Sequence, residues 1–180
     1  MTGVKEQLDS FTLKIPEKFI VFTPGAIYGP SKQWPVGHYR ELGEKLHIAF
    51  GYEIILLGTY DDIESSEKIS QDHNWIYNYC GKTTLSQLLA ILTKARLLVG
   101  NDSGSMHLMA ALQRPQIAVF GSTSPTWTGP INSNATVISR NLTCSPCFSR
   151  TCRFGHYECL TQINPEEVFI EVQKHFSQAY

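Results

Sequence analysis

The residues best suited to chemistry in this chain are Asn101-Asp102-Ser103-Gly104. They follow an apolar run over 95–100, which predicts a strand, and precede a helical pattern over 105–112. A helix that starts directly after a strand leaves its first backbone N–H groups unpaired, and such groups bind anions. A carboxylate beside an anion-binding site repels a phosphate. Its presence is explained if it binds sugar hydroxyls or stabilises a developing positive charge. We therefore predict a nucleotide-sugar site centred on this turn.

Similar turns follow other short apolar runs. The apolar runs predict five strands, at 19–23, 53–57, 75–79, 95–100 and 116–120, and each strand is followed by a crossover helix. Strands joined in this way pair in parallel, so their end turns meet at the carboxyl edge of one sheet, where α/β proteins bind ligands. These turns begin near Gly25, Gly58, Gly81, Asn101 and Gly121. The predicted fold is a Rossmann-like, three-layer α/β domain with a parallel sheet.

Helical spacing and helix-start signals place the helices between these strands. The expected ranges are 35–50, 62–71, 84–94 and 105–112, with a last helix that opens at Asn164-Pro165. Thr84 and Gln87 have the spacing of a capping box. A loop over 122–134, a short edge strand over 135–138 and a cysteine-rich segment precede the last helix. We assign residues 1–18 to a linker and 19–180 to one ligand-binding domain.

Composition and charge are those of an ordinary globular protein. The chain has 180 residues, 42% of them hydrophobic, and a formal net charge of −1. This size suits a single domain, and the absence of a basic run argues against nucleic acid as a partner. The apolar stretches are too short to span a bilayer, and no signal-type apolar core follows the first residues. These features predict a soluble, cytoplasmic protein.

Several segments together resemble the bacterial heptosyltransferases of glycosyltransferase family 9, most of all the heptosyltransferase II branch. The segments are Pro24-Gly25-Ala26, Lys32-Gln33-Trp34-Pro35, Leu57-Gly58, Asn101-Asp102-Ser103-Gly104-Ser105-Met106-His107, Arg114-Pro115, Phe120-Gly121-Ser122-Thr123-Ser124-Pro125 and the stretch from Cys144 to Cys159. The resemblance implies the C-terminal, donor-binding half of a two-domain GT-B glycosyltransferase. Such an enzyme transfers heptose from ADP-heptose to the lipopolysaccharide inner core with inversion.

The same resemblance implies what this half lacks. The acceptor, a lipopolysaccharide core, would be bound through a missing N-terminal domain that also carries the catalytic base, so the fragment alone is expected to be inactive. The family is regarded as metal-independent, and we expect no cofactor and no metal. In the full enzyme the implied location is the cytoplasmic face of the inner membrane, and any peripheral membrane contact belongs to that full enzyme.

Lys32 and Asp102 are the residues we expect to assist catalysis. The Lys32 ammonium would neutralise the donor diphosphate and the leaving ADP, although most loop lysines are simply solvated. Asp102 would hold sugar hydroxyls or balance the positive charge of the transition state, the alternative being a helix N-cap. Ser103 and Gly104 would bind phosphate at the helix start. His107 lies one turn further on and is either a ligand contact or a core histidine.

The other expected donor contacts come from the earlier turns. They are Pro24, Gly25, Ala26, Asp62, Thr83 and Leu85. Small residues allow the backbone to approach a ligand closely. Asp62, with Asp61 as the next choice, would accept ribose hydroxyls, unless it only caps a helix. Thr83 and Leu85 would lie by the adenine, although a plain capping segment also explains Thr83. Thr123 and Ser124 are weaker phosphate candidates.

The cysteines allow more than one interpretation. Cys144, Cys147, Cys152 and Cys159, with His156 nearby, could form a zinc site, although zinc fingers normally pair two close doublets. A disulfide or reduced thiols explain them equally well. The C-x-x-C pair lacks the setting of a thioredoxin motif.

Two other functions compete with glycosyl transfer. A nicotinamide-dependent oxidoreductase would need a G-x-G-x-x-G turn after a strand, and the chain has none. A non-catalytic nucleotide-binding module would use the same turns without any turnover.

Overall fold

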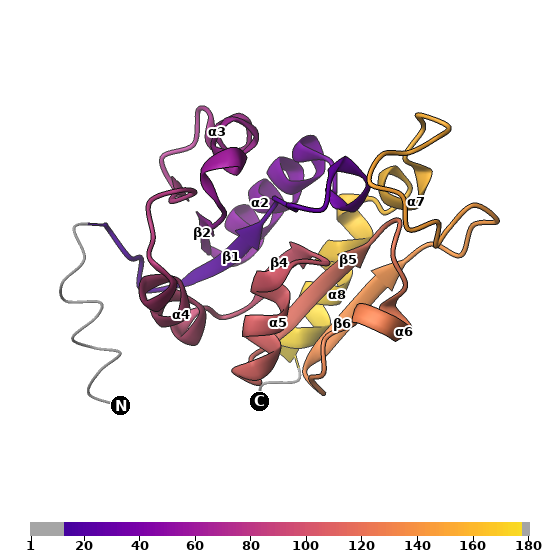
Figure 1. Ribbon diagram of the computed structural model, residues 1–180. Helices are drawn as coiled ribbons and strands as arrows, with labels where there is room; N and C mark the ends of the chain where they lie inside the picture. Colours follow the sequence, from indigo (N-terminus) through magenta and orange to yellow (C-terminus); the bar gives the residue numbers. More distant parts are fainter. Residues whose placement is uncertain (1–12, 178–180) are drawn as a thin grey trace.

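The computed structural model describes residues 13–177 and shows a six-stranded parallel sheet (Figure 1). The strands are β1 (Phe19–Thr23), β2 (Glu53–Leu56), β3 (Ile76–Asn78), β4 (Leu98–Asn101), β5 (Gln116–Phe120) and β6 (Ala135–Ser139). Their order is β3-β2-β1-β4-β5-β6, and every neighbouring pair is parallel. The predicted α/β class and the predicted edge strand are confirmed.

Helices cover both faces of this sheet. The longer ones are α2 (Val36–Phe50), α3 (Ile63–Ser70), α4 (Leu85–Lys94), α5 (Gly104–Ala111) and α8 (Pro165–Ser177). Helices α2, α3 and α8 pack together on one face, and α4 and α5 lie on the other, which gives the predicted three layers. Short turns of helix also occur where we expected loops or longer elements: η1 (Pro30–Lys32), η2 (Tyr60–Asp62), α6 (Pro125–Thr128) and α7 (Glu158–Thr161).

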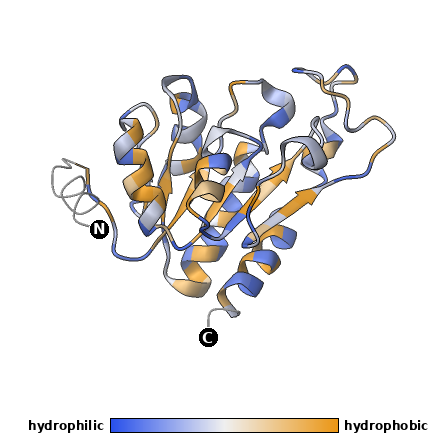
Figure 2. Ribbon diagram, turned by 60° about the horizontal axis from the view of Figure 1, so that its bottom comes forward, coloured by the Kyte–Doolittle hydropathy of each residue, from blue (hydrophilic) through white to orange (hydrophobic). Residues whose placement is uncertain are grey.

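Alternation along the strands divides the core in two. In β1, Ile20 and Phe22 pack against the α2 and α8 side, whereas Phe19 and Val21 pack against the α4 and α5 side. All five β1 residues are buried, because helices cover both faces of a parallel sheet and leave no side of the strand to water. Figure 2 shows the strands as apolar along their length, while the helices carry apolar residues mainly toward the sheet.

The strand order places a crevice between β1 and β4. From β1 the chain winds outward to β3, and from β4 it winds the opposite way to β6. Ligands of open α/β sheets bind at such a switch point, outside the carboxyl ends of the strands. Thr23 and Gly100, near the ends of these two strands, are partners in the register. A Cβ at Gly100 would collide with the Thr23 hydroxyl, so glycine lets the two strand ends approach without a shift of Thr23.

Part of the segment assigned to a linker lies against the domain. Pro16 is buried, and Leu13 and Ile15 pack on the core beside α4. Lys14 donates a hydrogen bond to the hydroxyl of Tyr77 at 2.7 Å, and Tyr79 donates one to the Lys14 carbonyl. Residues 1–12 of the assigned linker and residues 178–180 of the assigned domain lie outside the described residues.

Candidate functional site

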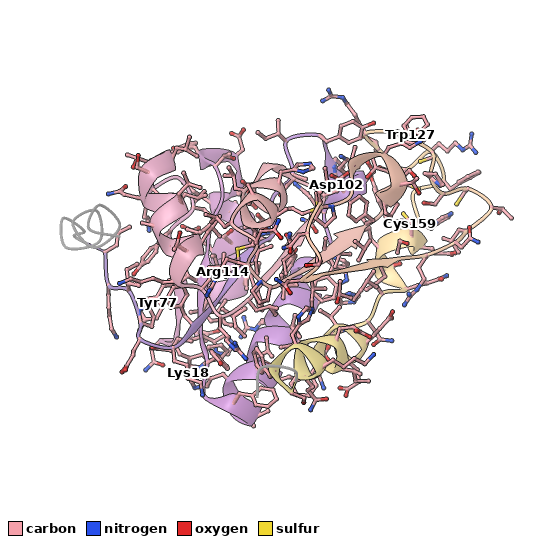
Figure 3. The ribbon with its side chains drawn as sticks, turned by 90° about the horizontal axis from the view of Figure 1, so that it is seen from below. Lys18, Tyr77, Asp102, Arg114, Trp127 and Cys159 are labelled. Carbon is pink, nitrogen blue, oxygen red and sulfur yellow. The ribbon has the colours of Figure 1, made fainter. Side chains whose placement is uncertain are left out.

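A cavity of about 690 Å³ opens at the carboxyl edge, where the turns after β1, β2, β3 and β4 converge. Every predicted site residue except Pro24 lines it: Gly25, Ala26, Lys32, Asp62, Thr83, Leu85, Asp102, Ser103, Gly104 and His107. In Figure 3, Asp102 lies toward one side of the molecule and Lys18, which precedes β1, toward the other. The predicted convergence of strand-end turns therefore describes this cavity.

Pro24 lies behind the cavity wall and serves the scaffold. Its carbonyl accepts a hydrogen bond from the Asn101 side-chain amide at 2.7 Å. The other end of the same amide, Oδ1, accepts from the backbone N–H of Trp34 at 3.0 Å and from the Tyr39 hydroxyl at 3.1 Å. Asn101 and Tyr39 are fully buried, and burial raises the pKa of Tyr39 above its ordinary value. Asn101 thus fixes the β1 turn and the Lys32 loop to the end of β4.

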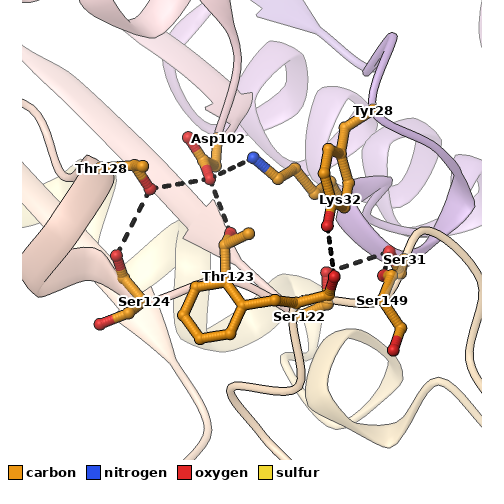
Figure 4. Close-up of polar contacts among 10 residues, drawn as sticks. Tyr28, Ser31, Lys32, Asp102, Ser122, Thr123, Ser124, Thr128 and Ser149 are labelled. Atoms are coloured by element: carbon orange, nitrogen blue, oxygen red, sulfur yellow. Dashed lines mark hydrogen bonds and ion pairs between the residues drawn. The ribbon is translucent and has the colours of Figure 1, made fainter.

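Lys32 and Asp102 form a buried ion pair at the floor of the cavity. Lys32 Nζ lies 2.6 Å from Asp102 Oδ2 (Figure 4), and the two residues are 9% and 5% exposed. The ammonium also lies 4.6 Å from the centre of the Tyr28 ring, within the range of a cation–π contact. The alternative of a solvated lysine is wrong, because this side chain is turned inward onto a carboxylate.

Asp102 does not cap the following helix. The N-cap of α5 is Ser103, and its side chain makes no capping hydrogen bond. Asp102 instead accepts hydrogen bonds from the hydroxyls of Thr123 at 2.6 Å and Thr128 at 3.0 Å, besides the ion pair with Lys32. The alternative of an N-cap role for Asp102 is therefore wrong, and the start of α5 faces the cavity without a side-chain cap.

His107 is exposed and lines the cavity, one turn into α5. The alternative of a core histidine is therefore wrong. Leu85 and Thr83 also line the cavity, and Leu85 is 64% exposed. The predicted capping box at the start of α4 is confirmed, with Thr84 and Gln87 bonded reciprocally.

Asp62 is both a capping residue and part of the cavity wall. Its Oδ2 accepts hydrogen bonds from the backbone N–H of Thr59 at 2.7 Å and from the Thr59 hydroxyl at 2.8 Å, as in a capping box. The side chain fits between two glycines, because a Cβ at Gly25 or Gly58 would collide with it. Asp61, the second choice, is exposed and does not line the cavity.

Several cavity residues escaped the sequence analysis. Tyr28, Thr59, Tyr60 and Thr128 line the cavity beside the predicted residues. Thr59 could have been found, because Thr59 and Asp62 have capping-box spacing. Tyr28 and Thr128 carry no signal of this kind, since each reaches the site from a loop and meets partners distant in the sequence.

The cysteine-rich segment gathers its thiols beside the site, but they are free. Cys144, Cys147, Cys152 and Cys159 line one small cavity next to Ser31 and Ser122. Burial, with a contribution from the neighbouring thiols, raises the pKa of Cys159 to about 11. The backbone N–H of Tyr157, with further backbone N–H groups, lowers the pKa of Cys152. Of the three interpretations, reduced thiols match the structure.

Residues 13–177 contain neither a metal-binding cluster nor a membrane-spanning helix. No group of three or more His, Cys, Asp or Glu side chains is arranged to hold a metal ion. No helix in this range has both the length and the apolar character needed to cross a membrane.

The sequence profile of glycosyltransferase family 9 (heptosyltransferase) matches residues 2–158. The chain belongs to this family. Lipopolysaccharide heptosyltransferase 2 of Salmonella typhimurium is 35% identical over 173 residues, which are 93% of this chain and 49% of that protein. Its counterpart in Escherichia coli is 34% identical over 169 residues, 91% of this chain and 48% of that protein.

Solved structures of family 9 agree with the fold. E. coli ADP-heptose lps heptosyltransferase II superposes with a TM-score of 0.84 at 34% identity, over 98% of this chain and 52% of that one. E. coli heptosyltransferase WaaC, solved with ADP, superposes with a TM-score of 0.72 at 25% identity, over 96% and 48%. The resemblance to the family, and within it to heptosyltransferase II, is confirmed. The chain spans about half the length of the curated relatives that it matches.

Proposed function

We propose that this chain is the donor-binding half of a heptosyltransferase and binds ADP-heptose in the cavity at the carboxyl edge. The observation that carries the proposal is the buried Lys32–Asp102 pair beside the start of α5. This arrangement places a cation and helix N–H groups, which bind phosphates, next to a carboxylate, which binds hydroxyls. A nucleoside diphosphate joined to a sugar presents both kinds of group.

The remaining lining residues extend this assignment along the donor. We assign the adenine to the wall formed by Thr83 and Leu85, and the ribose hydroxyls to Asp62, whose Oδ2 is held by Thr59. Gly25 and Ala26 form the backbone turn against which the donor would lie, and His107 flanks the diphosphate. The heptose then falls at Asp102. The support for this order is the sequence of turns around the cavity.

The proposed reaction is transfer of heptose with inversion at the anomeric carbon. An acceptor hydroxyl attacks that carbon, the bond to ADP breaks, and the electron pair leaves with the diphosphate. Lys32 and the N–H groups of α5 would stabilise the charge on ADP, and Asp102 would balance the positive charge on the sugar ring. No metal or cofactor enters this assignment.

The acceptor and its base belong to the other half of the proposed enzyme. The relatives are about twice as long as this chain and are named for lipopolysaccharide, so we infer a lipopolysaccharide core acceptor bound by an N-terminal domain. The corresponding location is the cytoplasmic face of the inner membrane. A half of this kind would bind the donor and turn it over only with its partner domain.

Calorimetric titration with ADP-heptose, ADP and NAD tests the donor assignment. We expect ADP-heptose to bind more tightly than ADP, because Asp102 adds contacts to the sugar, and NAD to bind weakly or not at all. Equal or tighter binding of NAD would overturn the proposal. Because the chain spans about half the length of its relatives, a module that binds the donor without transferring it is the second candidate. A transfer assay with a separately expressed N-terminal half of a relative distinguishes the two functions.

A further inference from the structure

All the hydrogen bonds that the described residues make to the Asp102 carboxylate fall on one of its two oxygens. Lys32 Nζ, Thr123 Oγ1 and Thr128 Oγ1 lie 2.6, 2.6 and 3.0 Å from Oδ2. Figure 4 shows the lines from these three partners meeting at one oxygen of the carboxylate, while no line reaches the other oxygen. Among the described residues Oδ1 therefore has no hydrogen-bond donor, and Asp102 lines the cavity in which the donor sugar is proposed to bind.

The two hydroxyls come from the segment that follows β5, where the sequence analysis placed only the weaker phosphate candidates Thr123 and Ser124. Thr123 follows β5, and Thr128 is the last residue of α6. The Thr128 hydroxyl also lies 3.4 Å from the carbonyl of Ser124, but it has one proton and the Asp102 oxygen is the nearer acceptor at 3.0 Å. Both donors are therefore directed at Asp102.

We propose that Thr123 and Thr128 are positioning residues that fix the orientation of the Asp102 carboxylate. They hold Oδ2 toward the protein and thereby present Oδ1 to the hydroxyls of the donor sugar. Thr123, first considered a phosphate contact, acts here through Asp102. This inference rests on the proposed function, because it assigns the sugar to Asp102.

The hydroxyls matter most when Lys32 has a second anion to bind. If the ammonium turns toward the donor diphosphate, Asp102, which is 5% exposed, loses much of its compensation by positive charge. A buried carboxylate without hydrogen-bond donors is costly. Two hydroxyls that remain bonded to Oδ2 still supply hydrogen-bond donors to the carboxylate and hold its orientation while Lys32 serves the diphosphate. The two threonine hydroxyls therefore hold Asp102 in place while Lys32 binds the diphosphate, because a single lysine could not do both at once.

Replacement of the hydroxyl by a methyl group tests this role. Thr128→Val removes the donor at nearly constant volume, Thr128→Ser restores it, and Thr123→Val removes the second donor. Thr93→Val is the matched control, because the Thr93 hydroxyl bonds the Leu89 carbonyl at 2.8 Å within α4, away from the cavity. Calorimetry gives the affinity of each variant for ADP and for ADP-heptose, and crystal structures of the wild type and Thr128→Val without ligand give the carboxylate orientation.

We expect Thr128→Val and Thr123→Val each to weaken ADP-heptose binding about tenfold, the value of one charge-assisted hydrogen bond, and to change ADP binding less than about twofold. Thr128→Ser should bind ADP-heptose as the wild type does, and Thr93→Val should change neither affinity. Equal losses for both ligands, or no loss, would overturn the positioning role. If the wild type shows no preference for ADP-heptose, the proposed function fails. In that event the crystal structures still decide the positioning role, because an unrotated carboxylate in Thr128→Val would contradict it.

Discussion

The Lys32–Asp102 pair shows how a single buried contact can prepare a site for a charged ligand. Each partner is buried, and a buried charged group is costly unless an opposite charge or hydrogen bonds accompany it. A buried ion pair is weak evidence for stability, because desolvation offsets much of the Coulomb attraction. Its value here lies in placement: the pair keeps a cation and a carboxylate at fixed positions in the cavity before any ligand arrives.

The Lys32 side chain should decide affinity for the diphosphate and not for the nucleoside. Lys32→Ala should weaken ADP binding about ten- to a hundredfold, because it removes a charge-assisted contact, and leave adenosine binding within about twofold. Calorimetric titration of both ligands gives the two ratios. Lys94→Ala, which removes an exposed lysine at the far end of α4, is the matched control and should change neither affinity. Equal losses for ADP and adenosine would show that Lys32 does not contact phosphate.

At the scale of elements, the site depends on how closely the strand-end turns approach one another. Asp62, in η2 after β2, reaches the Gly25 turn after β1 and bonds Thr59 at the same time. A side chain at Gly25 would occupy the space of the Asp62 carboxylate. The glycine therefore allows the first two turns to form one wall of the cavity.

This close approach makes Gly25 a sensitive position. Gly25→Ala should push Asp62 away from Thr59 and lower the free energy of unfolding by about 1–3 kcal/mol, as other overpacked substitutions do. Gly37→Ala is the matched control, because Gly37 is an exposed residue of α2 whose added Cβ would meet nothing within 4 Å. That change should raise the free energy of unfolding by about 0.4–1 kcal/mol. Urea denaturation measures both, and equal stability of the two variants would contradict this account of the turn.

The elements that the sequence predicts well are those specified by local pattern. The five main strands are short apolar runs because both of their faces are buried, and Thr84 and Gln87 mark a helix start through contacts three residues apart. Two of the wrong alternatives, a solvated Lys32 and an Asp102 cap, fail because these two residues, 70 positions apart, bind each other. Helix α6 was expected as loop because it is a four-residue turn within a Ser/Thr/Pro/Gly-rich stretch. Thr128 could not be assigned to the site from its own segment, because its partner Asp102 is 26 positions away.

At the scale of the whole molecule, the cavity depends on a sheet that is supported from both sides. Helix α8 packs against α2 and the sheet, on the side opposite α4 and α5. His175 near the end of α8 lies 2.9 Å from the Thr136 hydroxyl of β6, so it joins the last helix to the edge strand. His38, in the first turns of α2, lies on the same side of the sheet against Trp34. Both histidines are partly buried, and this connects the stability of the fold to pH.

Acid should destabilise the domain through these two histidines. Burial lowers the pKa of His38 and of His175 below the ordinary value of 6.5; for His175, Glu171 opposes this shift and Arg96 adds to it. The unfolded chain therefore binds more protons than the folded one below pH 6.5, and the free energy of unfolding falls as pH decreases from there through the folded pKa values. Thermal unfolding followed by circular dichroism should give a lower Tm at pH 5.5 than at pH 7.5. His175→Gln, which can still bond Thr136, should reduce that difference, and adding His38→Gln should reduce it further. A difference in Tm that is unchanged in the double variant would mean that other groups cause the acid sensitivity.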